Sequence, residues 1–163
     1  MGYAIRFVRP EAGRTLDETL EDSFSRLSIG SPNLRLSPEQ RTGWDQIVRR
    51  VTAELGSATS EEFRSDLVLR YQGPSGYMQL NYRGDWAELD IEYFYSGRLP
   101  LPGILAEAYT IATIVEQETG LAGFDVEAAQ WVAGADLALA AVKLAEATQR
   151  VRESKIRRGE LAG

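Results

Sequence analysis

Apolar and polar residues alternate with a period of two between residues 67 and 95, and this is the clearest pattern in the chain. It covers three segments, 67–71, 78–82 and 87–95, and side chains with this period point to opposite faces of a strand. Turn residues separate the segments, at Gly73–Gly76 and at Gly84–Asp85. The pattern therefore predicts an antiparallel meander of three strands.

A two-residue loop at Gly84–Asp85 fixes the register of the last two strands of this meander. One face of the sheet then carries apolar side chains and is predicted to be buried, whereas the other face carries polar ones. The predicted buried pairs are Leu80–Leu89 and Met78–Ile91, followed along the strand by Tyr93 and Tyr95, and the predicted polar pairs are Asn81–Glu88 and Gln79–Asp90.

Elsewhere, apolar residues recur at helical spacing next to residues that commonly cap helices. Thr15–Glu18 and Ser37–Gln40 both have the pattern of a capping box, in which two side chains and two backbone amides bond reciprocally. Further strands are predicted at 3–9 and 121–124, and helices are predicted from residue 16 and at 38–55, 101–119 and 135–157. Asp125 is predicted to cap a short turn after the strand at 121–124.

These elements indicate the α+β class. We expect an antiparallel sheet, made of the central meander and the N-terminal strand, with helices packed on one face and a long C-terminal helix. A length of 163 residues is sufficient for a single hydrophobic core. Residues 1–132 are expected to form the α+β domain, and residues 133–163 a helical extension that packs on the same domain or on a partner subunit.

The chain contains no histidine and no cysteine, which excludes the commonest general base near neutral pH and every thiolate nucleophile. A zinc site is not expected, because only carboxylates are left to ligate the metal. The sequence has neither a Gly-x-Ser-x-Gly nucleophile elbow nor a glycine-rich phosphate loop. It therefore predicts no catalytic residue, no metal and no cofactor.

Glu88, Asp90 and Glu92 alternate along the third strand of the meander and so share its polar face, about 6.7 Å apart from one to the next. Carboxylates at this spacing suit an inverting glycosidase, or a hard cation such as Mg²⁺ or Ca²⁺. The alternative is the solvated outer face of a one-sided sheet, where acidic residues are common.

Aromatic residues accompany these acids. Trp86 and Phe94 flank them on the same face, and Tyr77 is predicted to lie opposite Glu92. Exposed aromatic rings around a polar patch are typical of binding surfaces. We therefore predict a binding surface, with coverage of the rings by the C-terminal helix or by another subunit as the alternative. The residues of this predicted surface are Tyr77, Trp86, Glu88, Asp90, Glu92 and Phe94.

The C-terminal helix is rich in alanine and carries an apolar seam with heptad-like spacing. At 1.5 Å per residue it is about 35 Å long, which exceeds the extent of a small sheet. The seam is therefore predicted to support self-association into a homodimer, with packing against its own domain as the alternative. Its residues are Leu137, Ala141, Leu144, Thr148 and Val151.

The formal net charge of −6 disfavours nucleic acid as a partner of the whole molecule. Residues 150–158 nevertheless carry five basic residues and one glutamate, whereas residues 85–118 carry seven acidic residues and one arginine. We expect this basic tail to dock on the acidic segment of its own or a neighbouring chain. No run of about 20 apolar residues is present, so the sequence predicts a cytoplasmic protein with no membrane partner.

Two short motifs give the chain a resemblance to known proteins. The first strand begins Met-x-Tyr at Tyr3, and a predicted helix ends in a Gly-Leu-x-x-aromatic-Asp turn made of Gly120, Leu121, Phe124 and Asp125. In these features the chain resembles small bacterial α+β proteins of uncharacterised function, over roughly residues 3–9 and 63–126. Some of those proteins are similar to immunity proteins of polymorphic toxin systems, which block a toxin by binding it.

The resemblance implies a protein-binding role and carries over no catalytic residue. Such proteins often continue with Pro-Gln after the aspartate, where this chain has Val126–Glu127. The sequence thus favours a non-catalytic cytoplasmic protein that acts by protein–protein binding, with another protein or as a homo-oligomer. One alternative is a carboxylate-based or metal-dependent hydrolase that uses residues 88–92, and another is a small-ligand binding module.

Overall fold

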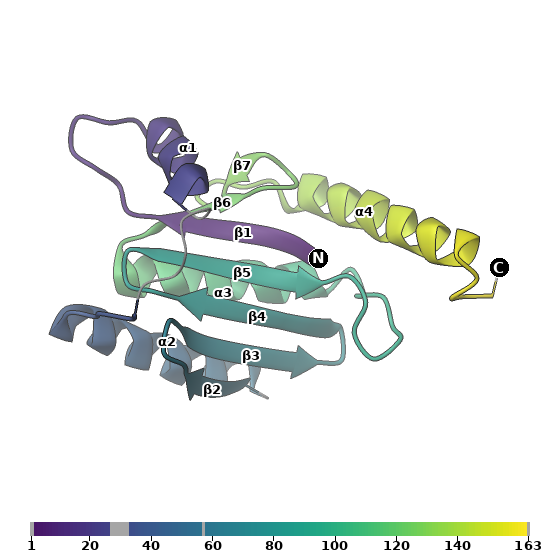
Figure 1. The fold of residues 1–163 in the computed structure, drawn as a ribbon, viewed down its shortest axis with the longest axis horizontal. Coiled ribbons are helices and arrows are strands. Elements are labelled where there is room, and N and C mark those ends of the chain that lie inside the picture. Colours follow the sequence, from purple (N-terminus) through teal and green to yellow (C-terminus); the bar gives the residue numbers. More distant parts are fainter. Residues whose placement is uncertain (1, 27–32, 57, 163) are drawn as a thin grey trace.

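The computed structural model describes residues 2–26, 33–56 and 58–162. Within them the chain forms an antiparallel sheet of seven strands in the order β2-β3-β4-β5-β1-β6-β7, together with four helices (Figure 1). The α+β class is confirmed. The strands are β1 (Gly2–Val8), β2 (Ala58–Glu62), β3 (Leu67–Gly73), β4 (Gly76–Tyr82), β5 (Trp86–Glu92), β6 (Ala122–Asp125) and β7 (Gln130–Trp131), and the helices are α1 (Leu16–Arg26), α2 (Pro38–Leu55), α3 (Ile104–Thr119) and α4 (Leu137–Arg157).

The predicted meander is strands β3, β4 and β5, and its register is confirmed. Leu80 pairs with Leu89 on the buried face, and Gln79 pairs with Asp90 on the other. The loop between β4 and β5 closes when the Arg83 amide donates to the Trp86 carbonyl, at 2.9 Å. β1 then pairs with β5 from the other side, as the predicted N-terminal strand should.

Two strands of the sheet were not predicted. β2 has the sequence Ala-Thr-Ser-Glu-Glu, and four of its five side chains are exposed, so it lacks the apolar alternation that marks a half-buried strand. It forms as an edge strand because β3 offers a free row of backbone groups, and its charged residues protect that edge. β7 is only two residues long and pairs with the end of β6.

The side chain of Tyr95 was expected on the buried face, and this prediction is wrong. β5 ends at Glu92, and a tight turn closed by reciprocal backbone bonds between Tyr95 and Arg98 redirects the chain. The ring of Tyr95 consequently stacks on that of Tyr77, with centroids 4.5 Å apart. The predicted alternation holds as far as Tyr93, which is buried.

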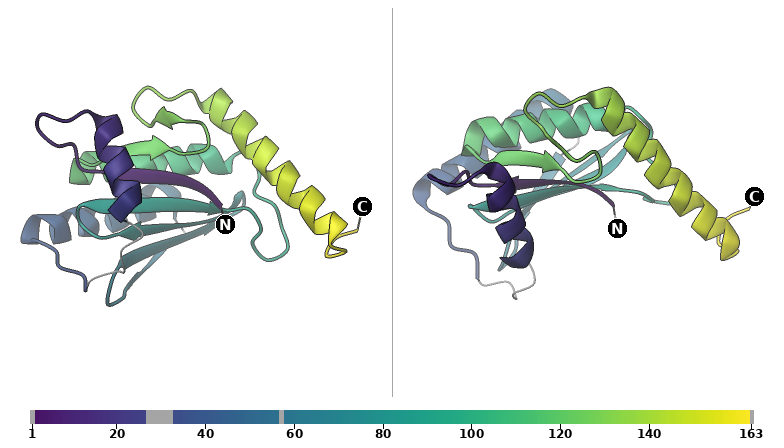
Figure 2. Two further views of the ribbon diagram at one scale, coloured as in Figure 1. Left: turned by 45° about the horizontal axis from the view of Figure 1, so that its top comes forward. Right: turned by 90° about the horizontal axis from the view of Figure 1, so that it is seen from above.

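The hydrophobic core lies between the sheet and the layer formed by α2 and α3, as Figure 2 shows. Tyr3, Ile5 and Phe7 of β1 contribute to it, and so does every second residue of β3, β4 and β5. Helix α1 lies on the opposite side of the sheet (Figure 2), where Leu20 and Val8 are buried outside the main core.

Both capping boxes are confirmed. In the second one, the Ser37 amide donates to Gln40 Oε1 at 2.9 Å, and the Gln40 amide donates to Ser37 Oγ at 3.1 Å. Gln40 also donates to Asp85, which joins the start of α2 to the β4–β5 loop. Helix α3 begins at Ile104, three residues later than the predicted 101. The cause is Pro102, which disfavours a helical backbone at Leu101.

Helix α4 packs on its own domain and also extends past the end of the sheet (Figure 1). Ala140, Leu144 and Ala147 are buried in the main core, with Ala141 and Val151 partly buried against it. Of the predicted seam, Leu144 therefore serves the chain's own core, while Thr148 is half-buried and Leu137 is exposed. Leu144 of the seam thus packs within the chain, while self-association through the other seam residues stays a prediction.

This packing predicts unequal effects for two apolar residues of the same helix. Leu144 is 3 % exposed and Val142 is 52 % exposed. We expect Leu144→Ala to lower the free energy of unfolding by about 2 kcal/mol and Val142→Ala by less than about 0.5 kcal/mol. Urea denaturation of both variants measures the difference. Equal losses in the free energy of unfolding would show that Leu144 does not anchor α4 in the core.

Candidate binding site

The predicted row of acids lies on the face of the sheet away from α2 and α3, and an arginine partly neutralises it. Arg6 of β1 pairs with Glu88 at 2.6 Å, and both side chains are about one-fifth exposed. The two residues are directly opposite one another in the β1–β5 ladder. Sequence reasoning did not find this pair because it left the register of β1 open. Glu88 is therefore not a free carboxylate.

Asp90, the middle acid, is half-buried next to Glu88. Burial raises the pKa of its carboxyl to about 7, and the charge of Glu88, a hydrogen bond with Glu88 and the charge of Glu92 add to this effect. No three acidic side chains in the described part of the chain come together in a way that could hold a metal ion. The metal-dependent alternative therefore has no geometric support in the described residues.

The raised pKa of Asp90 makes folding stability depend on pH. The folded state holds the proton up to about pH 7 while the unfolded state releases it near pH 4, so wild-type stability falls as the pH rises between these values. Because Asp90 is partly exposed, we expect Asp90→Asn to raise the free energy of unfolding by about 2 kcal/mol at about pH 8 and to change little near pH 4.

Urea denaturation across this pH range measures the effect, with Asp45→Asn as the matched control at an exposed acid of α2. The same pH profile in the wild-type and Asp90→Asn proteins would contradict the account of Asp90.

The structure divides the predicted binding surface between two ends of β5. Trp86 lies at the start of the strand, where the guanidinium of Arg83 sits 5.3 Å from the centre of its ring. Tyr77, Glu92 and Phe94 lie towards the other end, where β5 meets α4 and the turn at Tyr95. This second group borders a hollow large enough for a ligand.

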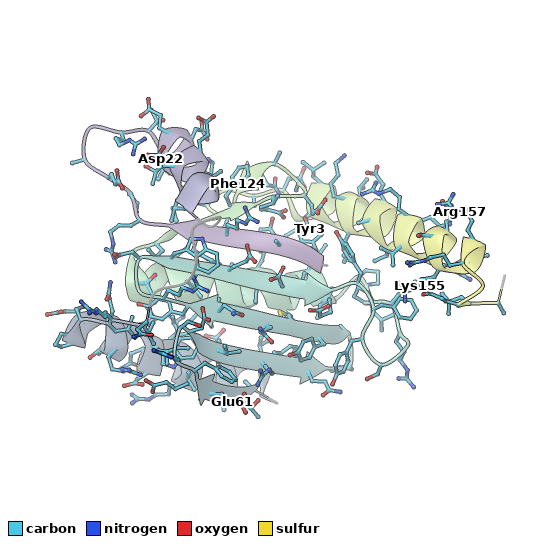
Figure 3. The ribbon with its side chains drawn as sticks, viewed as in Figure 1. Tyr3, Asp22, Glu61, Phe124, Lys155 and Arg157 are labelled. Atoms are coloured by element: carbon cyan, nitrogen blue, oxygen red, sulfur yellow. The ribbon has the colours of Figure 1, made fainter. Side chains whose placement is uncertain are left out.

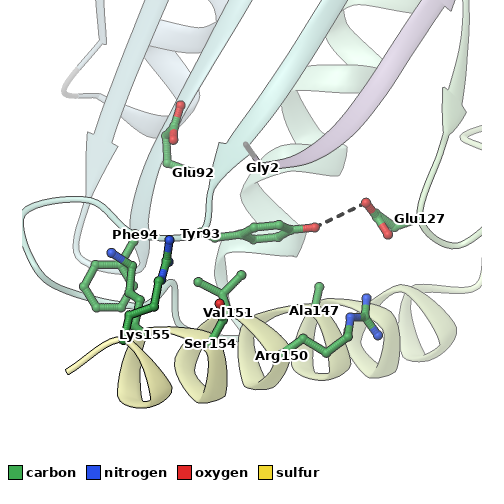
Figure 4. Close-up of a pocket in the computed structure, with 11 residues that line it drawn as sticks. Gly2, Glu92, Tyr93, Phe94, Glu127, Ala147, Arg150, Val151, Ser154 and Lys155 are labelled. Atoms are coloured by element: carbon green, nitrogen blue, oxygen red, sulfur yellow. Dashed lines mark hydrogen bonds between the residues drawn. The ribbon is translucent and has the colours of Figure 1, made fainter. Parts of the chain in front are cut away.

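That hollow, the α4 cleft, separates α4 from the end of the sheet and has a volume of about 690 Å³ (Figure 4). β1 and β5 contribute one side, and the C-terminal half of α4 contributes the other. The residues that line it are Gly2, Glu92, Tyr93, Phe94, Glu127, Ala147, Arg150, Val151, Ser154, Lys155 and Arg158.

Acidic and basic side chains face each other across the α4 cleft. The sheet side carries Glu92 and, beyond the Tyr93 ring, Glu127, which accepts a hydrogen bond from the Tyr93 hydroxyl at 3.2 Å (Figure 4). The α4 side carries Arg150, Lys155 and Arg158. The Tyr93 hydroxyl lies close to Glu127, and its burial together with that charge raises its pKa to about 12, so it stays a donor at neutral pH.

The basic residues near the end of α4 contact either an acid on their own side of the cleft or the aromatic ring of Phe94. Lys155 and Arg158 both pair with Glu160, at 3.3 and 3.4 Å. Lys155 also lies over the Phe94 ring, 4.5 Å from its centre. Among the described residues no ion pair crosses from one wall to the other, and neither Glu92 nor Arg150 forms one at all.

Sequence reasoning found part of this site. Glu92 and Phe94 belong to the predicted surface. The basic tail lies across the cleft from Glu92 and places Lys155 over the Phe94 ring, but no ion pair among the described residues joins it to the acidic segment. Arg150 and Arg158 belong to the predicted basic tail, whereas Ser154 was missed, although its spacing of four residues from each of them places it on the same helical face. No pattern in the sequence pointed to Glu127.

A second hollow adjoins the first. It has a volume of about 590 Å³ and lies beside the stacked rings of Tyr77 and Tyr95, with Arg98 at its rim. Glu92 lines both hollows.

Residues of the two sequence motifs meet inside the protein. The Tyr3 hydroxyl donates to the Asp125 carboxylate at 2.6 Å, and the Tyr109 hydroxyl donates to the same oxygen. The other Asp125 oxygen accepts from the Ala128 amide at 3.0 Å, as predicted for a capping residue. Asp125 is fully buried, so this network is structural and does not contact a ligand.

The comparisons with known proteins do not extend the resemblance. A scan against protein-family models, a search of curated proteins and a search of solved structures each return no match for this chain. In the residues that the structure describes, no helix combines the length and the apolar character needed to cross a membrane.

Proposed function

We propose that this protein is a non-catalytic cytoplasmic protein that acts by protein–protein binding, and that it holds a segment of its partner in the α4 cleft. The observation that supports this best is the position of two opposite charges, Glu92 and Arg150, which line the α4 cleft and form no ion pair within the described part of the chain. Charged groups at such a position increase the specificity of a protein interface, since wrong partners leave them unsatisfied.

The shape of the site favours a polypeptide over a compact metabolite. The two hollows adjoin at Glu92, and an extended chain can follow both while its side chains enter them alternately. The resemblance to small bacterial α+β proteins supports the same role, because some of those proteins are similar to immunity proteins, which act by binding another protein.

A small-ligand binding module is the second candidate. The volume of the α4 cleft, about 690 Å³, lies within the range of small-molecule sites. The carboxylate hydrolase has less support, because Arg6 engages Glu88, and of the three acids in this row Glu92 is the one that lines the α4 cleft.

Quantitative affinity capture from cells, with three forms of the protein as bait, tests the proposal. The wild type is compared with Arg150→Glu/Lys155→Glu, which alters the cleft, and with Arg152→Glu/Arg157→Glu, which makes the same change in net charge outside it. Figure 3 shows Lys155 on the sheet side of α4 and Arg157 on the opposite side.

We expect at least one polypeptide to be retained by the wild type and by the Arg152/Arg157 variant and to be lost from the cleft variant. Identical recovery with all three baits would contradict the proposal. Thermal unfolding of each bait establishes that the substitutions leave the fold intact.

A further inference from the structure

The charges of the α4 cleft carry information about the chemistry of the partner. Because the sheet wall presents Glu92 and Glu127 and the helix wall presents Arg150, Lys155 and Arg158, a ligand in the cleft touches both signs of charge at once. A purely acidic segment would meet repulsion from the first wall, and a purely basic segment would meet it from the second.

Some charged side chains of the two walls already have a hydrogen bond or an ion pair within the described part of the protein, and others have none. Lys155 and Arg158 share Glu160, and Glu127 accepts from Tyr93. Glu92 and Arg150 have neither a hydrogen bond nor an ion pair among the described residues. These two side chains therefore have the most to gain from a partner, one from a cation and the other from an anion.

Apolar surface lies between these charges. Val151 and Ala147 of α4 face Tyr93 across the cleft, and Figure 4 places them between Glu92 and Arg150. Burial of apolar side chains on this floor supplies binding free energy that charge pairs at a solvated rim do not.

We infer that the α4 cleft takes a dipolar polypeptide segment, in which a basic side chain contacts Glu92, an apolar side chain covers the floor beside Val151, and an acidic side chain contacts Arg150. The inference rests on the proposed function and specifies the kind of partner. Side chains on one side of an extended segment are about 6.7 Å apart, which lets neighbouring positions reach the two walls.

Opposite charge reversals in the two walls test this assignment. The affinity of the polypeptide recovered with the wild-type protein is measured for Glu92→Arg, for Arg150→Glu and for the control Arg152→Glu. A dipolar segment loses an attraction in both cleft variants, so we expect each to bind at least about tenfold more weakly. The control should stay within about threefold of the wild type.

An increase in affinity with either reversal would overturn the inference, because a purely acidic partner gains from Glu92→Arg and a purely basic one gains from Arg150→Glu. The proposed function would still stand after that result if the Arg150→Glu/Lys155→Glu bait recovers a different amount of the polypeptide from the wild-type bait. Such a difference would show that the polypeptide binds in the cleft. Recovery that is indifferent to every cleft charge would overturn both. The neutral variants Glu92→Gln and Arg150→Gln, expected to show intermediate losses, separate charge effects from damage to the fold.

Discussion

Replacement of Asp125 by alanine is expected to lower the free energy of unfolding by about 4 kcal/mol. The carboxylate is fully buried and accepts from the hydroxyls of Tyr3 and Tyr109 and from the Ala128 amide. These donors belong to β1, to α3 and to the turn after β6, so one side chain joins three parts of the fold. Its removal leaves buried donors without an acceptor and opens a cavity. Urea denaturation measures the loss.

Asp136→Ala is the control for this experiment, because Asp136 caps α4 from an exposed position and its loss should cost only about 1 kcal/mol. If the Asp125→Ala chain does not fold, Tyr3→Phe tests the same network through one hydrogen bond, with an expected loss of about 1 to 2 kcal/mol. A loss below about 1 kcal/mol for Asp125→Ala would show that the network contributes little to stability.

Ser154→Trp is expected to weaken partner binding by at least about 100-fold while leaving stability nearly unchanged. Ser154 lines the α4 cleft, and its hydroxyl forms no hydrogen bond with the residues that the structure describes. An indole at this position fills space that a bound segment would occupy. A 100-fold loss of affinity corresponds to about 2.7 kcal/mol of binding free energy, which is a usual cost of blocking a central contact. Titration of the captured polypeptide with both proteins measures the change.

Gln149→Trp is the matched control, since Gln149 is exposed on α4 and does not line the cleft. It adds the same bulk and apolar surface to the same helix. Equal weakening by the two substitutions would mean that the α4 cleft is not where the partner binds.

The sheet was largely predictable because its signals are local. The alternation in β4 and β5 and the loop at Gly84–Asp85 together determine the register, since a shift of one residue would turn Leu80 and Leu89 to the solvent. β2 escaped because its pairing depends on the free edge of β3, which is a property of the sheet and not of the residues Ala58–Glu62.

The candidate site was predictable only in part because it is assembled from distant segments. Glu92 and Phe94 stood out as an acid and an aromatic ring next to one another on the polar side of a strand. Their relation to Arg150 depends on the angle at which α4 leaves the sheet, which is set by the burial of Ala140, Leu144 and Ala147. The same burial explains why Leu144 of the heptad-like seam packs within the chain, while the predicted second subunit stays a prediction.

The chain has no histidine or cysteine, so acidic residues are the first candidates for the chemistry of a site. The acids that could have replaced them are divided among different tasks, with Glu88 bound to Arg6 and Asp125 buried among tyrosines. Glu92 of the predicted row lines both of the hollows described above. A carboxylate that faces a wall of basic side chains is suited to recognition of a charged segment.

Site-specific photo-cross-linking in cells tests the central claim most directly. A benzophenone amino acid is placed at Ser154 inside the α4 cleft, and at Gln149 on another side of the same helix as control. We predict that irradiation yields a defined adduct with another polypeptide from position 154 and not from position 149, and that Arg150→Glu/Lys155→Glu abolishes it. The absence of an adduct from position 154, or equal adducts from both positions, would contradict binding of a partner in the cleft.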